Sequence, residues 1–241
     1  MTCIAGSVAE AYYGVPALYQ AECKNRLPAD MLEVLERFEA VRGRWQCLHD
    51  VEGGNECVRV DKPDNHICFD VGDITELEVD AIVNAANTAL LGSGGVDGAI
   101  HRAAGPGLAD ECMRLKSCEV GEAKIAAGWQ LKAKHVIHTV GSRYEENNSC
   151  CAELLYVCYR NSLDLAKQYD LHSIAFPAIS TGLFGYPKQE AASVALRAVS
   201  DWFSANPNYG MSVVMSCHSQ EMLRRYQNAV DSKTYKGDKR T

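Results

Sequence analysis

The sequence of 241 residues lacks the features that mark membrane and secreted proteins. No apolar run approaches the roughly 20 residues that a membrane-spanning helix requires. Residues 1–5 lack the basic and apolar regions of a secretory signal, and no Arg-rich transit peptide is evident, since Glu10 precedes the first basic residue, Lys24. We therefore expect an intracellular protein, cytoplasmic or nuclear, that does not bind a membrane; a mitochondrial location stays open.

Positive charge is also scarce. The chain carries 24 Lys and Arg against 31 Asp and Glu, for a net charge of −7. Such a chain has no general attraction to nucleic acid, so any affinity for phosphate must come from local donors. We interpret the basic residues at 233–240 as a solvated tail, and we expect a monomer that does not bind nucleic acid directly.

Paired C-x-x-C motifs are absent, although the chain contains 11 cysteines. Several metal-ligand types gather in the first third, namely Cys47, His49, Cys57, His66 and Cys68. Without a paired motif, and with His66 in a predicted strand, we favour reduced cysteines and a strand histidine over structural zinc. We accordingly expect neither a metal ion nor a cofactor.

Strand-like and helix-like segments alternate from about residue 66 onward. Such alternation predicts an α/β fold with a sheet covered by helices on both faces. Residues 1–64 do not follow this alternating pattern, and we predict that they form an N-terminal extension with a helix at 28–43. The expected strands are 66–71, 80–83, 122–126, 135–140, 173–177 and 212–216, and the expected helices are 97–116 (whole or broken at 105–106), 151–169, 187–204 and 220–230.

Two strand-to-helix loops, 84–96 and 178–186, are rich in small and hydroxyl residues. In an open α/β sheet, ligands bind beyond the carboxyl ends of the strands. Small residues let backbone N–H groups approach a phosphate, and a following helix points its positive end at the ligand. The two loops together predict a site that holds a diphosphate between them.

Common nucleotide motifs fit these loops poorly. No Gly-Lys-Ser/Thr follows the glycines, and Asp97 stands where a dinucleotide fingerprint beginning at Gly92 has Gly or Ala. The helix dipole favours an acid at a helix start by about 0.3–1 kcal/mol, so Asp97 can be explained without a catalytic role. His101 lies one turn further on the same face, and Asn84 and Asn87 are turn formers or ligand amides. The combination of acid, amides and glycines favours a reactive sugar-phosphate site.

Five segments of the sequence together resemble the macrodomains and, within them, the MacroD-type ADP-ribosyl hydrolases. They are Val-Gly-Asp-Ile-Thr at 71–75, Asp-Ala-Ile-Val-Asn-Ala-Ala-Asn at 80–87, Gly-Gly-Val-Asp-Gly-Ala-Ile-His at 94–101, Ile-His-Thr-Val-Gly at 137–141 and Ile-Ser-Thr-Gly-Leu-Phe-Gly-Tyr-Pro at 179–187. The resemblance covers about residues 68–226. It implies a three-layer α/β/α domain with a mixed central sheet. We expect this domain at 65–232, after an N-terminal extension at 1–64 and before a basic tail at 233–241.

The resemblance also implies the ligand, ADP-ribose, and the residues around it. Asp73 would accept a hydrogen bond from the adenine amino group, with Ile74 beside it, and Asn87 and Asp97 would face the distal ribose. His101 would support Asp97. The other implied ligand contacts are Asn84, Gly95, Val96, Ser180, Thr181, Gly182, Leu183, Phe184 and His218.

The implied reaction is hydrolysis of the ester that joins the distal ribose to a carboxyl group. The implied substrates are mono-ADP-ribosylated Asp and Glu side chains of proteins, and O-acetyl-ADP-ribose. A water between Asp97 and a phosphate oxygen would attack while Asn87 orients the sugar, and either Asp97 or the phosphate serves as base. The alternatives are a non-catalytic ADP-ribose reader and, more remotely, a phosphatase acting on phosphorylated ADP-ribose.

Two positions depart from the family pattern. Ser93 stands where the family usually has glycine, so the loop gains a hydroxyl and loses conformational freedom. Cys217 and His218 stand where the family often places an aromatic residue against the adenine. A histidine ring still stacks but is more polar and titrates near neutral pH, so we expect weaker or pH-sensitive packing on the adenine rather than a different reaction.

Overall fold

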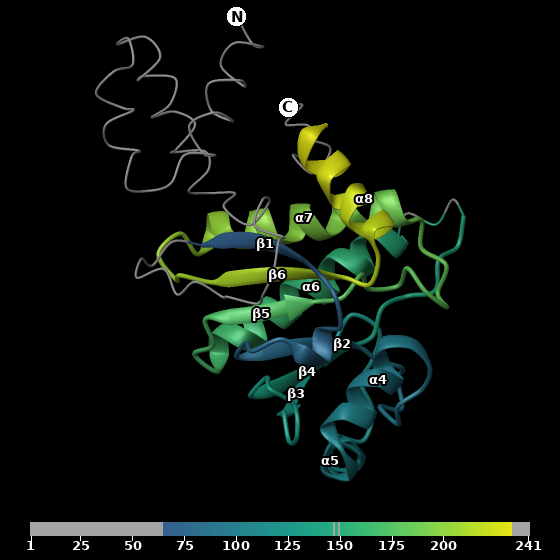
Figure 1. Cartoon of the computed structure of the whole chain (residues 1–241). Helices are drawn as coiled ribbons and strands as arrows, with labels where there is room; N and C mark the ends of the chain where they lie inside the picture. Colours follow the sequence, from purple (N-terminus) through teal and green to yellow (C-terminus); the bar gives the residue numbers. More distant parts are fainter. Residues whose placement is uncertain (1–64, 147, 149, 233–241) are drawn as a thin grey trace, which may run out of the picture. The chain divides into compact units, whose positions relative to one another are not determined.

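The described residues, 65–146, 148 and 150–232 of this computed structural model, form a mixed six-stranded sheet. The strand order is β1-β6-β5-β2-β4-β3, in which neighbours from β1 to β4 are parallel and β3 is antiparallel to β4 (Figure 1). The strands are β1 His66–Val71, β2 Ala81–Ala85, β3 Ala123–Ala127, β4 His135–Thr139, β5 Ser173–Phe176 and β6 Ser212–Cys217.

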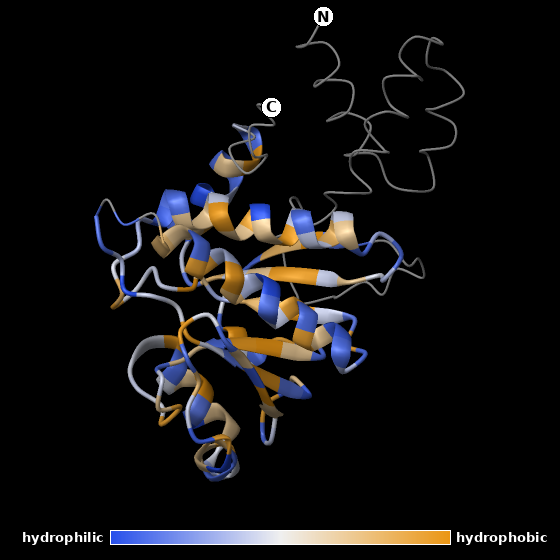
Figure 2. Ribbon diagram, turned by 180° about the vertical axis from the view of Figure 1, so that it is seen from behind, coloured by the Kyte–Doolittle hydropathy of each residue, from blue (hydrophilic) through white to orange (hydrophobic). Residues whose placement is uncertain are grey.

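Helices cover both faces of this sheet, which confirms the predicted α/β/α layering (Figures 1 and 2). They are η1 Ile74–Glu76, α4 Gly95–Ala104, α5 Pro106–Leu115, α6 Cys150–Gln168, α7 Lys188–Ala205 and α8 Gln220–Asp231. Helices α4 and α5 pack on one face near β2 and β3, whereas α6, α7 and α8 pack against one another on the opposite face.

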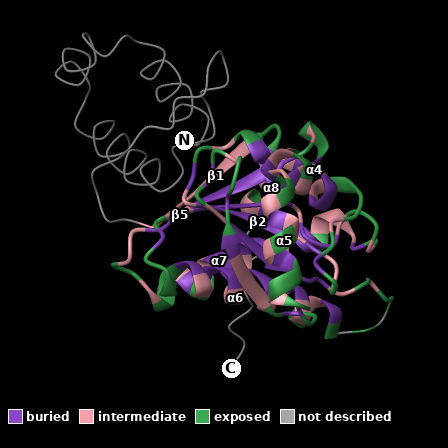
Figure 3. Ribbon diagram, turned by 90° about the horizontal axis from the view of Figure 1, so that it is seen from below, coloured by how far each residue is buried: buried purple, intermediate pink, exposed green. Residues whose placement is uncertain are grey.

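Alternation along the strands separates the two cores, because successive side chains point to opposite faces. Ile82 and Val136 belong to the core that contains the buried residues of α4 and α5. On the other face, Phe176 of β5 contacts Tyr159 of α6, with 4.9 Å between ring centroids. Figure 3 shows how burial concentrates in the central strands between the helical layers, whereas the edge strands β1 and β3 are mostly of intermediate burial.

The predicted order of strands and helices is confirmed throughout the described residues, with ends that differ by only a few positions. Of the two alternatives for the first long helix, the structure shows the broken one: Gly105 adopts φ 76° and separates α4 from α5. Pro106 then occupies the first turn of α5, where its missing N–H costs no helical hydrogen bond. The helix expected at 28–43 lies outside the described residues.

The cysteines differ in part from the expectation that all of them are reduced. Cys68 is disulfide-bonded. The other described cysteines, Cys112, Cys118, Cys150, Cys151, Cys158 and Cys217, have free thiols. In the part of the chain that the structure covers, no helix combines the length and apolar character needed to cross a bilayer.

Candidate functional site

The buried carboxylate of Asp97 is the centre of the candidate site. It lies in the first turn of α4 and is 2% exposed. Its Oδ1 accepts a hydrogen bond from Asn84 Nδ2 at 2.7 Å. Its Oδ2 accepts from Ser93 N at 2.7 Å, from Ser93 Oγ at 2.8 Å and from Asn87 Nδ2 at 3.4 Å. Folding therefore brings the acid and both predicted asparagines together.

The strand and the loop position the two asparagines differently. Asn84 follows Ile82 by two positions in β2, so both side chains point to the face that α4 covers. Asn87 lies beyond the strand, and its Oδ1 accepts from Ala89 N at 3.0 Å, which closes a local turn. Asn87 thus acts as a turn former through its oxygen while its amide nitrogen faces Asp97.

His101 lies one helical turn beyond Asp97, as the sequence predicted. Its Nε2 is 3.6 Å from Asp97 Oδ1, which is beyond hydrogen-bond length but close enough for an electrostatic contact. This nitrogen is buried and has no hydrogen-bond partner among the described residues. The loop packs tightly on the ring, since a Cβ at Gly92, where φ is 69°, would come within 2.9 Å of His101 Cγ.

Two residues beneath the site, His138 and Cys112, have no assigned role in the sequence-based prediction. His138 Nδ1 is 3.1 Å from Asn84 Nδ2, and His138 Nε2 is 3.5 Å from Cys112 Sγ. Burial and, to a smaller extent, the charge of His101 lower the pKa of His138 to about 4, although Asp97 acts in the opposite direction. The neutral ring is therefore the form present near neutral pH.

The signal for His138 was present but required the pairing of two strands. Asn84 and His138 are in register across β2 and β4, and each stands two positions after a residue of the same core, Ile82 and Val136. Among the described residues, His101, Cys112 and His138 also form a group whose possible metal-ligand atoms lie within 4.8 Å of one another.

The glycines at the start of α4 face open space. A Cβ added at Gly94 or Gly95 would meet no atom within 4 Å, and Gly95 has a φ of 64°. The backbone of the helix start is thus accessible beside the buried acid. An anion placed there would face the positive end of α4.

The second loop, between β5 and α7, is ordered by its own hydrogen bonds. Thr181 Oγ1 donates to Ala178 O at 2.8 Å, and Tyr186 N donates to Ser180 O at 2.9 Å. Ser180 has a φ of 64°, and its buried Oγ has no hydrogen-bond partner within the described part of the chain. Leu183 is 83% exposed, and Phe184 O accepts from Tyr144 N at 2.8 Å.

The predicted adenine-binding residues follow two paired strands. Val71 of β1 and Cys217 of β6 are in register, so Asp73 and His218 leave the sheet at the same edge. Asp73 caps η1, since its Oδ1 accepts from Thr75 N at 3.0 Å and from Thr75 Oγ1 at 2.8 Å. These bonds lower the pKa of Asp73, and the charges of His218 and Arg102 lower it further. Ile74 is buried.

All these segments meet at the carboxyl ends of adjacent parallel strands. Strands β1, β6, β5 and β2 are neighbours in the sheet, and they lead to Asp73, His218, Ser180 and Asn87 respectively. This edge is where open α/β sheets bind ligands. The arrangement offers backbone donors for a diphosphate and a buried carboxylate for chemistry next to it.

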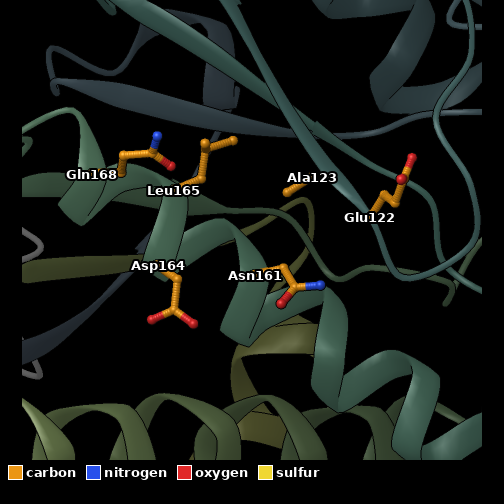
Figure 4. A pocket seen from close by; sticks show the side chains of 6 residues that line it. All are labelled: Glu122, Ala123, Asn161, Asp164, Leu165 and Gln168. Carbon is orange, nitrogen blue, oxygen red and sulfur yellow. The ribbon is translucent and has the colours of Figure 1, made fainter.

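A separate acidic hollow of about 300 Å³ lies between α6 and the start of β3 (Figure 4). Two of its side chains are already bound, since Asn161 donates to Gly121 O and Asp164 accepts from Trp202 Nε1. Its position differs from that of the Asp97 centre, which lies on the face covered by α4, so we assign it no part in the candidate site. The lining residues are Glu122, Ala123, Asn161, Asp164, Leu165 and Gln168.

Comparison with known proteins places the chain in a family. The sequence profile of the Macro domain matches residues 83–195. A Macro domain-containing protein of Mesorhizobium japonicum is 51% identical over 168 residues, which cover 69% of this chain and 94% of that protein. The chain belongs to the macrodomain family. The ADP-ribose glycohydrolase MACROD1 of Bos taurus is 60% identical over 132 residues, which cover 54% of this chain but 41% of that protein.

Solved structures agree with the macrodomain fold. The Oceanobacillus iheyensis macrodomain with ADP superposes with a TM-score of 0.68 at 40% sequence identity, and the match covers 74% of this chain and 97% of that one. The expected three-layer macrodomain with a mixed sheet is therefore confirmed. What the sequence-based prediction missed in this macrodomain is the contact of Ser93 with Asp97 and the pair His138 and Cys112 below Asn84.

Proposed function

We propose that this macrodomain binds ADP-ribose at the carboxyl edge of its sheet and hydrolyses esters of the distal ribose. The proposed substrates are proteins mono-ADP-ribosylated on Asp or Glu, and O-acetyl-ADP-ribose. The single observation that carries the catalytic part is Asp97, a buried carboxylate held by two asparagines beside an open glycine loop. Family membership and the likeness to the ADP-ribose glycohydrolase MACROD1 support the choice of ligand.

The proposed binding mode uses the four strand ends in order. Asp73, Ile74 and His218 hold the adenine, whereas the first turn of α4, with Gly95 and Val96, holds the diphosphate through backbone N–H groups. The remaining proposed contacts to the diphosphate and the distal ribose come from Ser180, Thr181, Gly182, Leu183 and Phe184.

In the proposed mechanism a water attacks the carbonyl carbon of the ester while Asn87 orients the ribose. The bond between the carbonyl carbon and the ribose oxygen breaks, the ribose oxygen takes up a proton, and the other product is a carboxylate. The proton of the attacking water passes to Asp97 or to a phosphate oxygen. The contact of Asn87 with Asp97 is the longest of the four at 3.4 Å, so Asn87 is the donor that turns to the sugar most easily.

We also propose a boundary for the functional unit. Residues 65–232 contain the strands, helices and loops that this proposal uses, and we assign them to the macrodomain. Residues 1–64 are assigned to an N-terminal extension, and residues 233–241 to a basic tail.

The test uses a protein mono-ADP-ribosylated on glutamate, with release of the label and ADP-ribose affinity measured in parallel. We expect the wild-type protein to release the label, and Asp97→Ala and Asn87→Ala to bind ADP-ribose but to release the label much more slowly. O-acetyl-ADP-ribose is tested in the same way for acetate release. Tight binding of ADP-ribose by the wild type with no loss of label would contradict the enzymatic function.

A second candidate function is a non-catalytic reader of ADP-ribose. It is favoured by the hydrogen bonding of Asp97, because both carboxylate oxygens already accept from Asn84, Asn87 and Ser93. The carboxylate therefore also holds the loop in its conformation. In a reader, Asp97→Ala weakens ADP-ribose binding because the loop loses the hydrogen bonds that hold its conformation. In a hydrolase, Asp97→Ala lowers the rate far more than the affinity.

A further inference from the structure

Four buried side chains form a continuous chain of contacts below the candidate site. Cys112 Sγ is 3.5 Å from His138 Nε2, His138 Nδ1 is 3.1 Å from Asn84 Nδ2, and Asn84 Nδ2 is 2.7 Å from Asp97 Oδ1. Asn84, His138 and Cys112 have no exposed surface. Water therefore cannot replace a contact that one of them loses, and the direction of each hydrogen bond matters.

The chemistry of the groups determines these directions. Asp97 is an acceptor when ionised, so the amide nitrogen of Asn84 must face it; a flipped amide would set Oδ1 of Asn84 against the carboxylate. The same nitrogen faces His138 Nδ1, which must then be the acceptor. In a neutral ring this places the proton on Nε2, which points toward Cys112 Sγ.

We propose that His138 is a positioning residue for Asp97, because its unprotonated Nδ1 holds both N–H groups of the Asn84 amide in place. Asn84 then anchors Oδ1 of Asp97, so the carboxylate keeps the orientation in which Oδ2 accepts from Asn87 and Ser93. The role rests on the proposed hydrolysis. Within that reaction, His138 acts without touching the substrate.

A buried and neutral imidazole suits this role. Asp97, His101, Cys112 and Asn84 lie near the ring, and burial lowers the pKa of His138 to about 4. Protonation would place a second N–H on Nδ1, opposite the N–H of Asn84. The environment of His138 thus maintains the only charge state that can accept from Asn84.

The same tautomer opposes metal binding by the group of His101, Cys112 and His138. A metal ligand nitrogen must be unprotonated, and His138 Nε2, which is 3.5 Å from Cys112 Sγ, carries the proton in the required tautomer. Ligation there would move the proton to Nδ1 and break the contact with Asn84. The hydrogen-bond chain, rather than a metal, is therefore the function we assign to this cluster.

Two substitutions of His138 by carboxamide side chains distinguish its role in positioning Asn84 from its role in packing. His138→Asn places a carboxamide oxygen near the position of Nδ1, whereas His138→Gln reaches toward the position of Nε2 and leaves Asn84 without its acceptor. We expect His138→Gln to lower kcat by about 10- to 100-fold, because small displacements of reacting groups have effects of this size. Affinity for ADP-ribose should change by less than about twofold, and His138→Asn should keep most of the wild-type kcat.

The matched control is His135→Asn, on the same strand β4 but away from Asn84, and it should leave kcat unchanged. Thermal unfolding of all variants reports how far each is destabilised. The proposal is overturned if His138→Asn and His138→Gln have the same kcat, or if kcat follows melting temperature alone across the set.

A second measurement does not require turnover, so it distinguishes failure of this inference from failure of the proposed function. In full-length protein labelled with ¹⁵N-histidine, we expect His138 to show an unprotonated Nδ1 and a protonated Nε2 near neutral pH. A proton on Nδ1 would overturn the positioning role whether or not the protein hydrolyses an ester. The expected tautomer together with absent hydrolysis would remove only the proposed function.

Discussion

Two aspartates at the same edge of the sheet, Asp73 and Asp97, have contrasting surroundings. Asp73 is exposed after β1, and the partners of its side chain are the N–H and hydroxyl of Thr75. Asp97 is 2% exposed in α4 and accepts from Asn84, Asn87 and Ser93, which come from three separate positions before the helix. An exposed acid can meet a ligand directly, whereas a buried one acts through the groups that orient it.

The difference also separates two kinds of effect on function. The segment around Asp73 can lose a ligand contact without disturbing its neighbours, because its hydrogen bonds are local. The centre around Asp97 joins β2, β4, α4 and α5 through Asn84, His138 and Cys112, so a change there spreads to several elements. We therefore expect changes at Asp97 to affect the rate, and changes at Asp73 to affect affinity.

The largest expected effect is the difference in kcat between variants that remove the charge of Asp97 or of Asp73. Asp97→Asn should lower the rate of ester hydrolysis by about 10²- to 10⁴-fold, the range for loss of a general base, which is the role of Asp97 in one of the two proposed routes for the proton. Asp73→Asn should leave kcat within about twofold of the wild type, since this acid lies at the proposed adenine end. Kinetics on both variants at saturating substrate measure this difference. Equal losses of kcat in the two variants would contradict the assignment of Asp97 to the rate and Asp73 to affinity.

The next effect concerns stability and the buried ring of His138. Its folded-state pKa of about 4 lies below the unfolded value of 6.5, so the unfolded chain binds more protons between these pH values. Stability from the neutral ring is therefore present above the unfolded pKa and decreases as the pH falls through this interval. The loss is expected to reach about 3 kcal/mol.

Denaturant unfolding of wild type and His138→Asn between pH 6.5 and pH 4 measures this effect. The wild-type curve should lose stability more steeply than that of the variant, whose carboxamide does not titrate. Parallel curves would show that His138 is not buried as a neutral ring. Asp73→Asn is the control from the other region, because the pKa of Asp73 is lowered and its contribution is lost only at more acid pH.

A smaller effect is expected from the proposed adenine contact of Asp73. Asp73→Ala removes both the acceptor for the adenine amino group and the cap of η1. Loss of one hydrogen bond to a charged group corresponds to about a tenfold weaker Kd for ADP-ribose. Calorimetry with ADP-ribose and with ribose 5-phosphate tests this, because the second ligand has no adenine and should bind both proteins alike. A uniform loss for both ligands would contradict the adenine contact.

The smallest expected effect comes from Ser93, whose hydroxyl donates a hydrogen bond to Oδ2 of Asp97. Ser93→Gly should raise kcat by about two- to fivefold, since the freed oxygen can accept from the attacking water. Ser93→Ala is the matched control, because it removes the hydroxyl without adding the conformational freedom of glycine. A similar increase in both variants assigns the effect to the hydroxyl. A decrease in both would show that the hydroxyl assists the reaction.

Much of the fold was predictable because its signals are local. Alternating strand-like and helix-like patterns predicted the six strands and the α-helices of the described residues but not the short η1, and Gly105 with Pro106 marked the place where the first long helix could break. The candidate site was predictable in part for the same reason. Asn87 and Asp97 lie within one short loop and helix start, where turn and capping preferences operate between near neighbours.

The sequence by itself determined the order of the elements, the glycine loop and the acid at the start of α4, because turns and helix starts depend on adjacent residues. Only the tertiary structure decided which groups surround and orient that acid. His138 is 54 positions from Asn84 and reaches it through the pairing of β2 with β4, and α5 brings Cys112 to the same ring. Burial, tautomer and hydrogen-bond direction arise from such distant contacts, and no local pattern encodes them.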